Sequence, residues 1–366
     1  MLSIGPDSRC VASPELSEAL TAVERLASQA ERLESVGVTR DDVRVMADAG
    51  VLTGGFDGRF SPAQAREVAE QLAAASGALW FVAAQHRSPA ESAGATSNHE
   101  LRERYAEGLA SGTLLGAVSF AHLRRPRPTV VAERRATGWS ISGRLDWVTS
   151  WGLADVLLLM AETTGGDVVQ CLIPAVPQQG LIITGELALA AMGGTSTVGA
   201  MLDDLVVTDA AVAAVLPKHD WLLPDSQRTA NVPAAVVGLA RAAVNGLLTV
   251  ARQRGWDELG VLAEAWATDL VSSRARAYEL VDDTPPGEAI EERLALRGSI
   301  TRRAQDATAM LVAAQAGRAI LRSSSAQRWA REAMFALVQA QTHRSRNALV
   351  AAYLGEVRSP AGPTAR

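Results

Sequence analysis

The stretch that decides the fold lies near the middle of the chain, where residues 141–150 read Ile-Ser-Gly-Arg-Leu-Asp-Trp-Val-Thr-Ser and Ala154-Asp155 follow. Isoleucine, valine, threonine and tryptophan favour extended structure, so the stretch predicts a strand with one large aromatic residue. If Trp147 is buried, this is an ordinary core strand. An indole beside a hydroxyl is also a surface on which a planar ring system can lie, so the neighbouring segments must decide between the two interpretations.

Short strand-like runs surround this stretch. Each has the length of a strand and ends at turn residues, and no helical pattern separates one from the next. The runs are 129–132, 139–142, 156–160, 168–173, 181–183 and 201–207. They predict a small antiparallel β-barrel or sandwich rather than a parallel nucleotide-binding sheet.

Helical patterns lie on the N-terminal side of these strands. Apolar residues recur at helical spacing over residues 23–33, which predicts an amphipathic first helix. Ser61-Pro62-Ala63-Gln64 predicts the start of a later helix, because the serine and glutamine side chains can cap each other's amides and proline suits the first helical position.

On the C-terminal side, long helical patterns cover residues 232–253, 259–281, 288–321 and 326–354. They are broken by Thr284-Pro285-Pro286-Gly287 and by residues 322–325, and their lengths predict an antiparallel four-helix bundle. We therefore expect a mainly α protein with a central β domain. The expected domains are an N-terminal helical domain (1–116), a middle β domain (117–224) and a C-terminal bundle (225–366).

Composition excludes several classes of function. The 366 residues are 48% apolar and 20% charged, which is typical of a soluble globular protein. The net charge of −5 and the lack of a basic stripe argue against a nucleic-acid partner, and the basic cluster 124–127 is better interpreted as a solvated loop. Cys10 and Cys171 have no metal or redox spacing, so no metal is expected. Without a leader pattern or a long apolar run, we expect a cytoplasmic protein with no membrane association.

The order of helices, β domain and helical bundle, together with residues 141–155, resembles the acyl-CoA dehydrogenases. The stretch is similar to the family's Asn-Gly-x-Lys-x-Trp-Ile-Thr, followed by Ala-Asp. The resemblance implies FAD as the cofactor, with FMN or reduced flavin as variants. It places Trp147 against the flavin ring system and Thr149 at its reactive edge, and Ser150 is expected to contact the cofactor beside them.

Further segments extend the resemblance from about residue 20 to about residue 355. Met-Gly-Gly-Thr-Ser-Thr at 192–197 is similar to the segment that closes the family's β domain, and Arg-Trp-Ala-Arg-Glu-Ala at 328–333 resembles the start of its last helix. Arg254 falls where the family keeps an arginine that reaches the flavin pyrophosphate of a neighbouring subunit. Gly317 is the one glycine that this sequence has where the family has a Gly-Gly-x-Gly cofactor loop. The resemblance implies a homodimer or homotetramer, or else a heteromer.

The family's catalytic carboxylate is missing. Dehydrogenation of an acyl thioester needs a base to remove the α proton while hydride leaves the β carbon. The family's Glu-Gly-Thr falls on Ala340-Gln341-Thr342, and the other position used for the base falls on Arg228. The cofactor loop expected after Ala117 is replaced by Ser119-Phe120-Ala121-His122. Compared with the acyl-CoA dehydrogenase pattern, this sequence therefore lacks the base and part of the flavin contacts.

Two histidines are candidates for the missing acid or base. His86 ends a helical pattern after Trp80-Phe81-Val82, and His343 lies shortly after Ala340. The alternative for each is a surface or hydrogen-bonded core histidine.

Three functions follow from the resemblance. The first is a flavin-dependent oxidoreductase acting on an acyl thioester or a related small organic substrate. The second is a monooxygenase that uses reduced flavin and oxygen. The third is a non-catalytic partner subunit of a two-chain acyl-CoA dehydrogenase.

Overall fold

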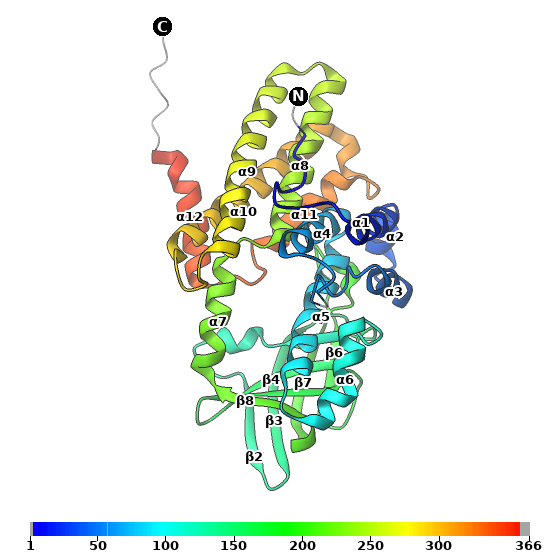
Figure 1. The fold of residues 1–366 in the computed structure, drawn as a ribbon, viewed down its shortest axis with the longest axis vertical. Coiled ribbons are helices and arrows are strands. Elements are labelled where there is room, and N and C mark those ends of the chain that lie inside the picture. Colours follow the sequence, from blue (N-terminus) through cyan, green and yellow to red (C-terminus); the bar gives the residue numbers. More distant parts are fainter. Residues whose placement is uncertain (1–2, 57, 359–366) are drawn as a thin grey trace. The chain divides into compact units, whose positions relative to one another are not determined.

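The computed structural model of the chain describes residues 3–56 and 58–358. Its contacts define two compact units, which we call the sheet unit (Cys10–Leu223) and the bundle unit (Met1–Arg9 with Pro224–Arg366). Figure 1 shows helices before the strands, the strands themselves, and long helices after them. The chain is therefore mainly α with a central β region, as expected.

The helices of the sheet unit have the bounds α1 Pro14–Ala27, α2 Ala30–Ser35, α3 Arg40–Asp48, α4 Pro62–Ala75, α5 Gly77–Ala95 and α6 His99–Ser111. The expected first helix is two helices, because the Ser28 hydroxyl bonds back to the carbonyl of Arg25 at 2.6 Å where α1 ends. The expected capping box is confirmed, with Ser61 N donating to Gln64 Oε1 at 2.8 Å and Gln64 N donating to Ser61 Oγ at 3.3 Å.

The strands are β1 Gly116–Ser119, β2 Val130–Arg135, β3 Gly138–Val148, β4 Val156–Thr163, β5 Asp167–Pro174, β6 Leu181–Glu186, β7 Val198–Thr208 and β8 Val212–Pro217. Among the described residues they form one sheet in the order β6-β7-β3-β2-β4-β5-β8, with β1 paired to β4.

Most pairs of the sheet are antiparallel, as expected, but the sheet is mixed, because β1 and β2 both run parallel to β4. Ser119 pairs with Leu159, and Val131 pairs with Glu162 further along the same strand. After β1, the chain leaves the edge of β4. It then returns as β2, which runs in the same direction beside a later part of β4. With only four residues, β1 gives too little pattern to be recognised in the sequence.

Strand β4 is the centre of the sheet unit. Its alternate residues enter two hydrophobic clusters, with Leu157, Leu159 and Ala161 in the larger one and Val156, Leu158 and Met160 in the other. Residues of α1 to α5 complete the larger cluster, so the N-terminal helices and the sheet share one core. The division of this region into two domains stays a prediction.

The bundle unit takes in the end of α7 Lys218–Ala230 and then α8 Ala234–Arg254, α9 Asp257–Asp283, α10 Ile290–Gln315, α11 Ser325–Ala336 and α12 His343–Arg358. Helix α10 packs against α8, α9, α11 and α12. The stretch Lys218–Arg254 is long and apolar enough to span a membrane by composition, but 72% of its apolar window is buried inside the protein. Packing in the bundle explains that apolarity.

The expected last helix is two helices, α11 and α12. Ala340 lies between them with φ +49°, and Thr342 and Ser345 cap the start of α12 by exchanging hydrogen bonds between side chain and amide. The buried Arg297 donates to the carbonyls of Gln339 and Ala340, each at 3.2 Å. A capped turn held by an arginine therefore interrupts the apolar pattern.

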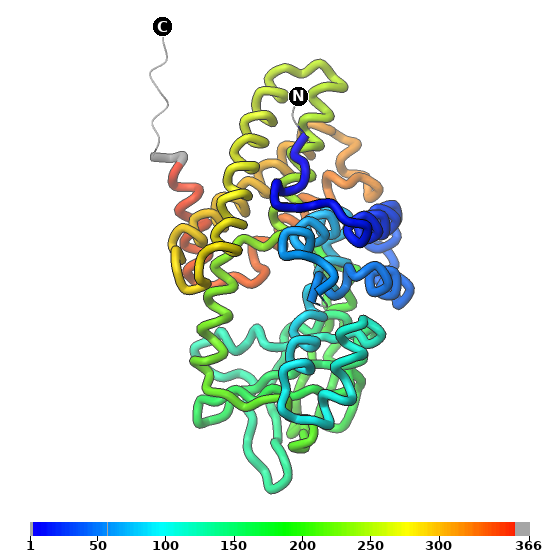
Figure 2. The backbone as a smooth tube through the Cα atoms, viewed as in Figure 1, coloured from blue at the N-terminus to red at the C-terminus, as the bar shows by residue number. Residues whose placement is uncertain are grey.

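The N-terminal residues of the bundle unit lie along α8, where Figure 2 draws them in blue. Ile4 is 4% exposed and joins the core of the bundle. Its amide donates to Asn245 Oδ1 at 2.9 Å, and its carbonyl accepts from Arg241 Nε at 3.0 Å. No motif in the sequence predicts this contact.

A buried arginine closes the turn between α9 and α10, where the proline and glycine residues predicted a break. Arg293 is 2% exposed and donates to the carbonyls of Leu280, Thr284 and Glu288 at 2.7, 2.9 and 2.9 Å. It also donates to Asn231 Oδ1 at 2.7 Å. The guanidinium thus satisfies carbonyls that the end of a helix leaves without an amide partner.

We expect Arg293→Met to lower the free energy of unfolding of the bundle unit by about 3 kcal/mol, because several buried carbonyls lose their donor. The matched control is Arg276→Met, whose side chain is 43% exposed, and it should cost less than about 0.5 kcal/mol. Urea unfolding followed by far-UV circular dichroism measures both. Equal stability of the two variants would contradict the role of Arg293.

Candidate functional site

Trp147 is turned to the solvent by an irregularity in β3. Leu145 pairs with Ala200 and Val148 with Val198, so β3 has one residue more than β7 over this interval. Leu145 and Val148 both point into the core, and the extra residue leaves Trp147 outside with 54% of its surface exposed. The indole is therefore not a core residue of this unit and is available as a platform.

Behind the indole, three threonine hydroxyls form a hydrogen-bonded chain. Thr149 Oγ1 lies 3.1 Å from Thr197 Oγ1, which lies 2.7 Å from Thr195 Oγ1. Thr195 in turn donates to the carbonyl of Met192 at 2.7 Å. All three threonines are buried, with exposures of 3% or less. Thr149 is among the site residues that the sequence predicts, whereas Thr195 and Thr197 are not, although the run Thr195-Ser196-Thr197 is a visible signal.

Two backbone hydrogen bonds join the end of β3 to the short helix η2 Gly193–Thr195. Ser150 N donates to the carbonyl of Thr195 and Trp151 N to that of Ser196, both at 2.9 Å. We call residues 147–151 together with 192–197 the β3–η2 corner. Val38 N donates to the carbonyl of Gly194 at 2.9 Å, which ties the corner to the loop after α2. Gly194 is required there, because a Cβ would come within 2.1 Å of the carbonyl oxygen of Leu33.

The corner holds unusual backbone and an unpartnered hydroxyl. Ser150, Met192 and Ser196 have φ of 66°, 62° and 48°, a region that costs a non-glycine residue about 1–3 kcal/mol. Ser150 is fully buried, and its Oγ has no hydrogen-bond partner among the described residues. Strained backbone and orphaned polar atoms concentrate at functional sites. The corner is therefore the candidate site.

A carboxylate beside the indole is already engaged. Asp146 forms ion pairs with Arg125 and, at 3.3 Å, with Arg144. Arg125 follows the short helix η1 Ala121–Arg124, the segment that stands in place of the expected cofactor loop. In η1, His122 is buried and its Nε2 lies 2.8 Å from the carbonyl of Met160. The segment in place of the cofactor loop is thus held by contacts to β3 and β4.

His86 is fully buried on α5, and backbone groups engage both of its ring nitrogens. The amide of Gly116 donates to Nδ1 at 3.0 Å, so Nε2 must carry the hydrogen that bonds the carbonyl of Leu109 at 2.9 Å. Burial lowers the pKa of His86 to about 4, against the opposing effect of the bond to Leu109. The ring links α5 and the end of α6 to β1, and this geometry leaves no nitrogen for exchange with a substrate.

The remaining predicted residues lie in the bundle unit. Arg254 is the exposed last residue of α8, and Gly255 follows it as a left-handed cap with φ +60°. Gly317 is exposed in the short helix η4 Ala316–Ile320, and a Cβ there would meet no atom within 4 Å. His343 is exposed at the start of α12. These three residues lie on three different elements of the bundle unit.

Solved structures show the same architecture. A probable acyl-CoA dehydrogenase from Mycobacterium abscessus is 18% identical, with a TM-score of 0.78 over 94% of this chain and 100% of that one. A glutaryl-CoA dehydrogenase from Mycobacterium smegmatis in complex with FADH2 is 16% identical, with a TM-score of 0.74 over 96% and 97%. The chain has the acyl-CoA dehydrogenase fold. A structure of PigA with FAD and proline is also similar, at 16% identity, a TM-score of 0.75 and coverage of 94% and 98%.

At these identities the similarity shows the fold alone. The sequence matches no protein-family model and no curated protein. The order of helices, strands and helices predicted this fold, and the similarity confirms it. The reaction must be inferred from the residues.

Within the acyl-CoA dehydrogenase fold, both positions expected to hold the base lack a carboxylate. Ala340 lies in the turn between α11 and α12. Arg228 lies on α7 and pairs with Asp225 at 2.9 Å, so that position carries a cation.

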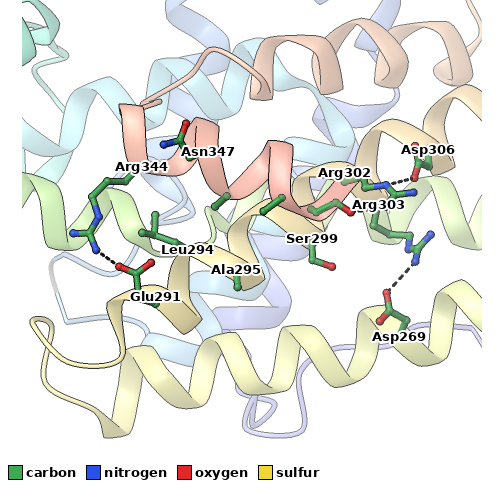
Figure 3. A pocket seen from close by; sticks show the side chains of 13 residues that line it. Asp269, Glu291, Leu294, Ala295, Ser299, Arg302, Arg303, Asp306, Arg344 and Asn347 are labelled. Carbon is green, nitrogen blue, oxygen red and sulfur yellow. Dashed lines mark hydrogen bonds and ion pairs between the residues drawn. The ribbon is translucent and has the colours of Figure 1, made fainter. Parts of the chain in front are cut away.

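A cavity of about 610 Å³ lies in the bundle unit between α9, α10 and α12 (Figure 3). Its charged side chains neutralise one another, since Arg303 pairs with Asp269 and Arg302 with Asp306, both at 3.2 Å. None of the predicted site residues lines it. The cavity is thus separate from the β3–η2 corner in sequence and in chemistry.

Burial of two histidines makes stability depend on pH. Burial lowers the pKa of His86 and of His122 from 6.5 to about 4. The unfolded chain therefore takes up these protons as pH falls below 6.5, whereas the folded chain does so only near pH 4. Their contribution to stability is complete above that window and is lost as pH falls through it.

We expect the shifted pKa of each buried histidine to lower the free energy of unfolding by about 2 kcal/mol when the pH falls from about 7 to about 5. The variant His86→Gln should lose its share of this pH dependence, because glutamine does not titrate there. His219→Gln serves as the control, since the His219 side chain is 80% exposed. Urea unfolding at both pH values gives the comparison. An unchanged slope in His86→Gln would contradict the shifted pKa.

Proposed function

We propose that the chain is a flavin-dependent oxidoreductase whose cofactor ring lies at the β3–η2 corner. The observation that carries the proposal is the exposed indole of Trp147 beside the buried hydroxyls of Thr149 and Ser150. Two structural neighbours support it, because one holds FADH2 and another holds FAD. We propose FAD as the cofactor, with FMN or reduced flavin as the alternatives.

The residues of the corner fit such a group. A 54% exposed indole offers a large apolar face to a planar ring. Ser150 Oγ, without a partner among the described residues, offers a hydrogen bond that a bound polar edge would complete. When bound, a flavin supplies hydride transfer, and the protein's task is to hold and orient it. Trp147 would cover one face, while Thr149 and Ser150 would meet polar atoms at an edge. In the bundle unit, Arg254 and Gly317 stay proposed cofactor contacts.

Proton transfer needs an acid or base outside the two base positions of the fold. Both base positions of the fold carry residues that cannot accept a proton, and both nitrogens of His86 are bonded to backbone. His343 is exposed at the start of α12, so its imidazole is open to solvent and to a ligand. We therefore propose His343 as the acid or base in preference to His86.

The lack of a carboxylate at Ala340 and Arg228 also favours two other functions. A monooxygenase that uses reduced flavin and oxygen needs no base for α-proton removal. A non-catalytic partner subunit needs no base at all. Reduction of bound flavin by an acyl-CoA would support the dehydrogenase, and oxygen consumption with reduced flavin and a second substrate would support the monooxygenase.

The substrate, assembly and location follow as part of the proposal. We propose an acyl thioester or a related small molecule as the substrate, and a homodimer or homotetramer, or a heteromer, as the assembly. A net charge of −5 gives no support for nucleic-acid binding. A cytoplasmic location completes the proposal.

Trp147→Ala should weaken FAD retention by about tenfold or more, because a large aromatic contact is lost. The matched control is Trp139→Ala, at the opposite end of β3, where the indole packs with Arg134 at 5.3 Å. FAD titration of the apoprotein, followed by visible absorbance and fluorescence, measures both variants. Equal affinities for the two variants, or a wild-type protein that cannot be reconstituted with any flavin, would end the proposal.

A further inference from the structure

The direction of every hydrogen bond in the threonine chain is fixed from one end. A carbonyl only accepts, so Thr195 gives its single hydroxyl hydrogen to the carbonyl of Met192 at 2.7 Å. Thr197 must then donate to Thr195 at 2.7 Å. Thr149 must in turn donate to Thr197 at 3.1 Å. The hydrogen of Thr149 is therefore committed inside the protein, and its oxygen can only accept from any further group.

Burial makes this arrangement rigid. Thr149 and Thr197 are 3% exposed and Thr195 is fully buried, so solvent offers the chain few alternative partners. In such surroundings a chain of hydrogen bonds polarises its members in one direction. Reversing it would take the 2.7 Å hydroxyl donor away from the Met192 carbonyl and leave that carbonyl only the amide of Thr195, at 3.1 Å. Ser150 differs, because its hydroxyl has no partner among the described residues and can donate or accept.

We propose that Thr195 and Thr197 are positioning residues that make Thr149 a pure hydrogen-bond acceptor, so that the β3–η2 corner prefers the reduced flavin ring. This inference rests on the proposed function. With N5 of the ring at Thr149, as the proposed function implies, a reduced isoalloxazine, whose N5 carries a hydrogen, would donate it to Thr149 Oγ1. The N5 atom of the oxidised ring holds a lone pair instead, and would face a second lone pair. The ligand class selected is a planar ring with an N–H at this edge.

The test is Thr197→Val, which keeps the shape of the side chain and removes the acceptor of the Thr149 hydrogen. Thr149 can then donate to N5 of the oxidised ring. We expect the ratio of reduced to oxidised flavin affinity to fall roughly tenfold, which lowers the midpoint potential of the bound flavin by about 30 mV for a two-electron couple. Spectroelectrochemical titration with a reference dye measures the potential without any substrate turnover.

Two further variants separate the hydrogen-bond effect from a packing effect. Thr197→Ser keeps the hydroxyl and should retain the wild-type potential. Thr195→Val removes the end of the chain, so that Thr197 is free to donate to Thr149, and it should shift the potential in the same direction as Thr197→Val. Thr195→Val also carries the test if Thr197→Val does not fold.

The outcomes are distinguishable from those of the proposed function. If the wild-type protein binds flavin and both valine variants keep its potential, or raise it, the inference is wrong while the flavin site stands. If Thr197→Ser shifts the potential as far as Thr197→Val, the effect comes from packing and the inference is also wrong. If the wild-type protein binds no flavin in either redox state, the proposed function fails, and the inference fails with it.

Discussion

Two backbone hydrogen bonds, from Ser150 and Trp151 to the carbonyls of Thr195 and Ser196, hold the candidate site together. They bring segments some 45 residues apart into one corner and keep non-glycine residues in a left-handed conformation. Because this corner is fixed, the extra residue of β3 has to project Trp147 outward, and the hydroxyl of Thr149 has to meet that of Thr197. A protein that needed only a core strand here would gain nothing from such strain.

The parts of the fold that depend on local pattern were predictable from the sequence. The capping box at Ser61, the proline-rich break after α9 and the strand with Trp147 all follow from residues close together in the chain. The parallel pairing of β1 and β2 with β4 was not predictable, since it depends on where the chain returns after η1. The turn at Ala340 was missed because an arginine from α10, Arg297, stabilises it.

The site shows the same division. Trp147 and Thr149 were recognisable, because they lie in one short motif. Thr195 and Thr197 acquire their meaning only when the strand order places them beside Thr149. His86 shows the opposite case. The expected place of His86 at the end of a helix suggested chemistry, but His86 lies inside α5, which continues to Ala95. Both of its ring nitrogens bond to backbone groups, which only the tertiary structure reveals. The polar framework for a ring can thus be present although both base positions hold residues that cannot accept a proton.

The most direct test of the central claim is amide hydrogen exchange of the full chain with and without added FAD, read by mass spectrometry. If a planar cofactor lies on Trp147, peptides that cover residues 145–151 and 192–198 should gain protection together on addition of FAD, because the bound ring stabilises both halves of the corner. Protection confined to other segments, or none anywhere while FAD stays in solution, would contradict a flavin site at the β3–η2 corner.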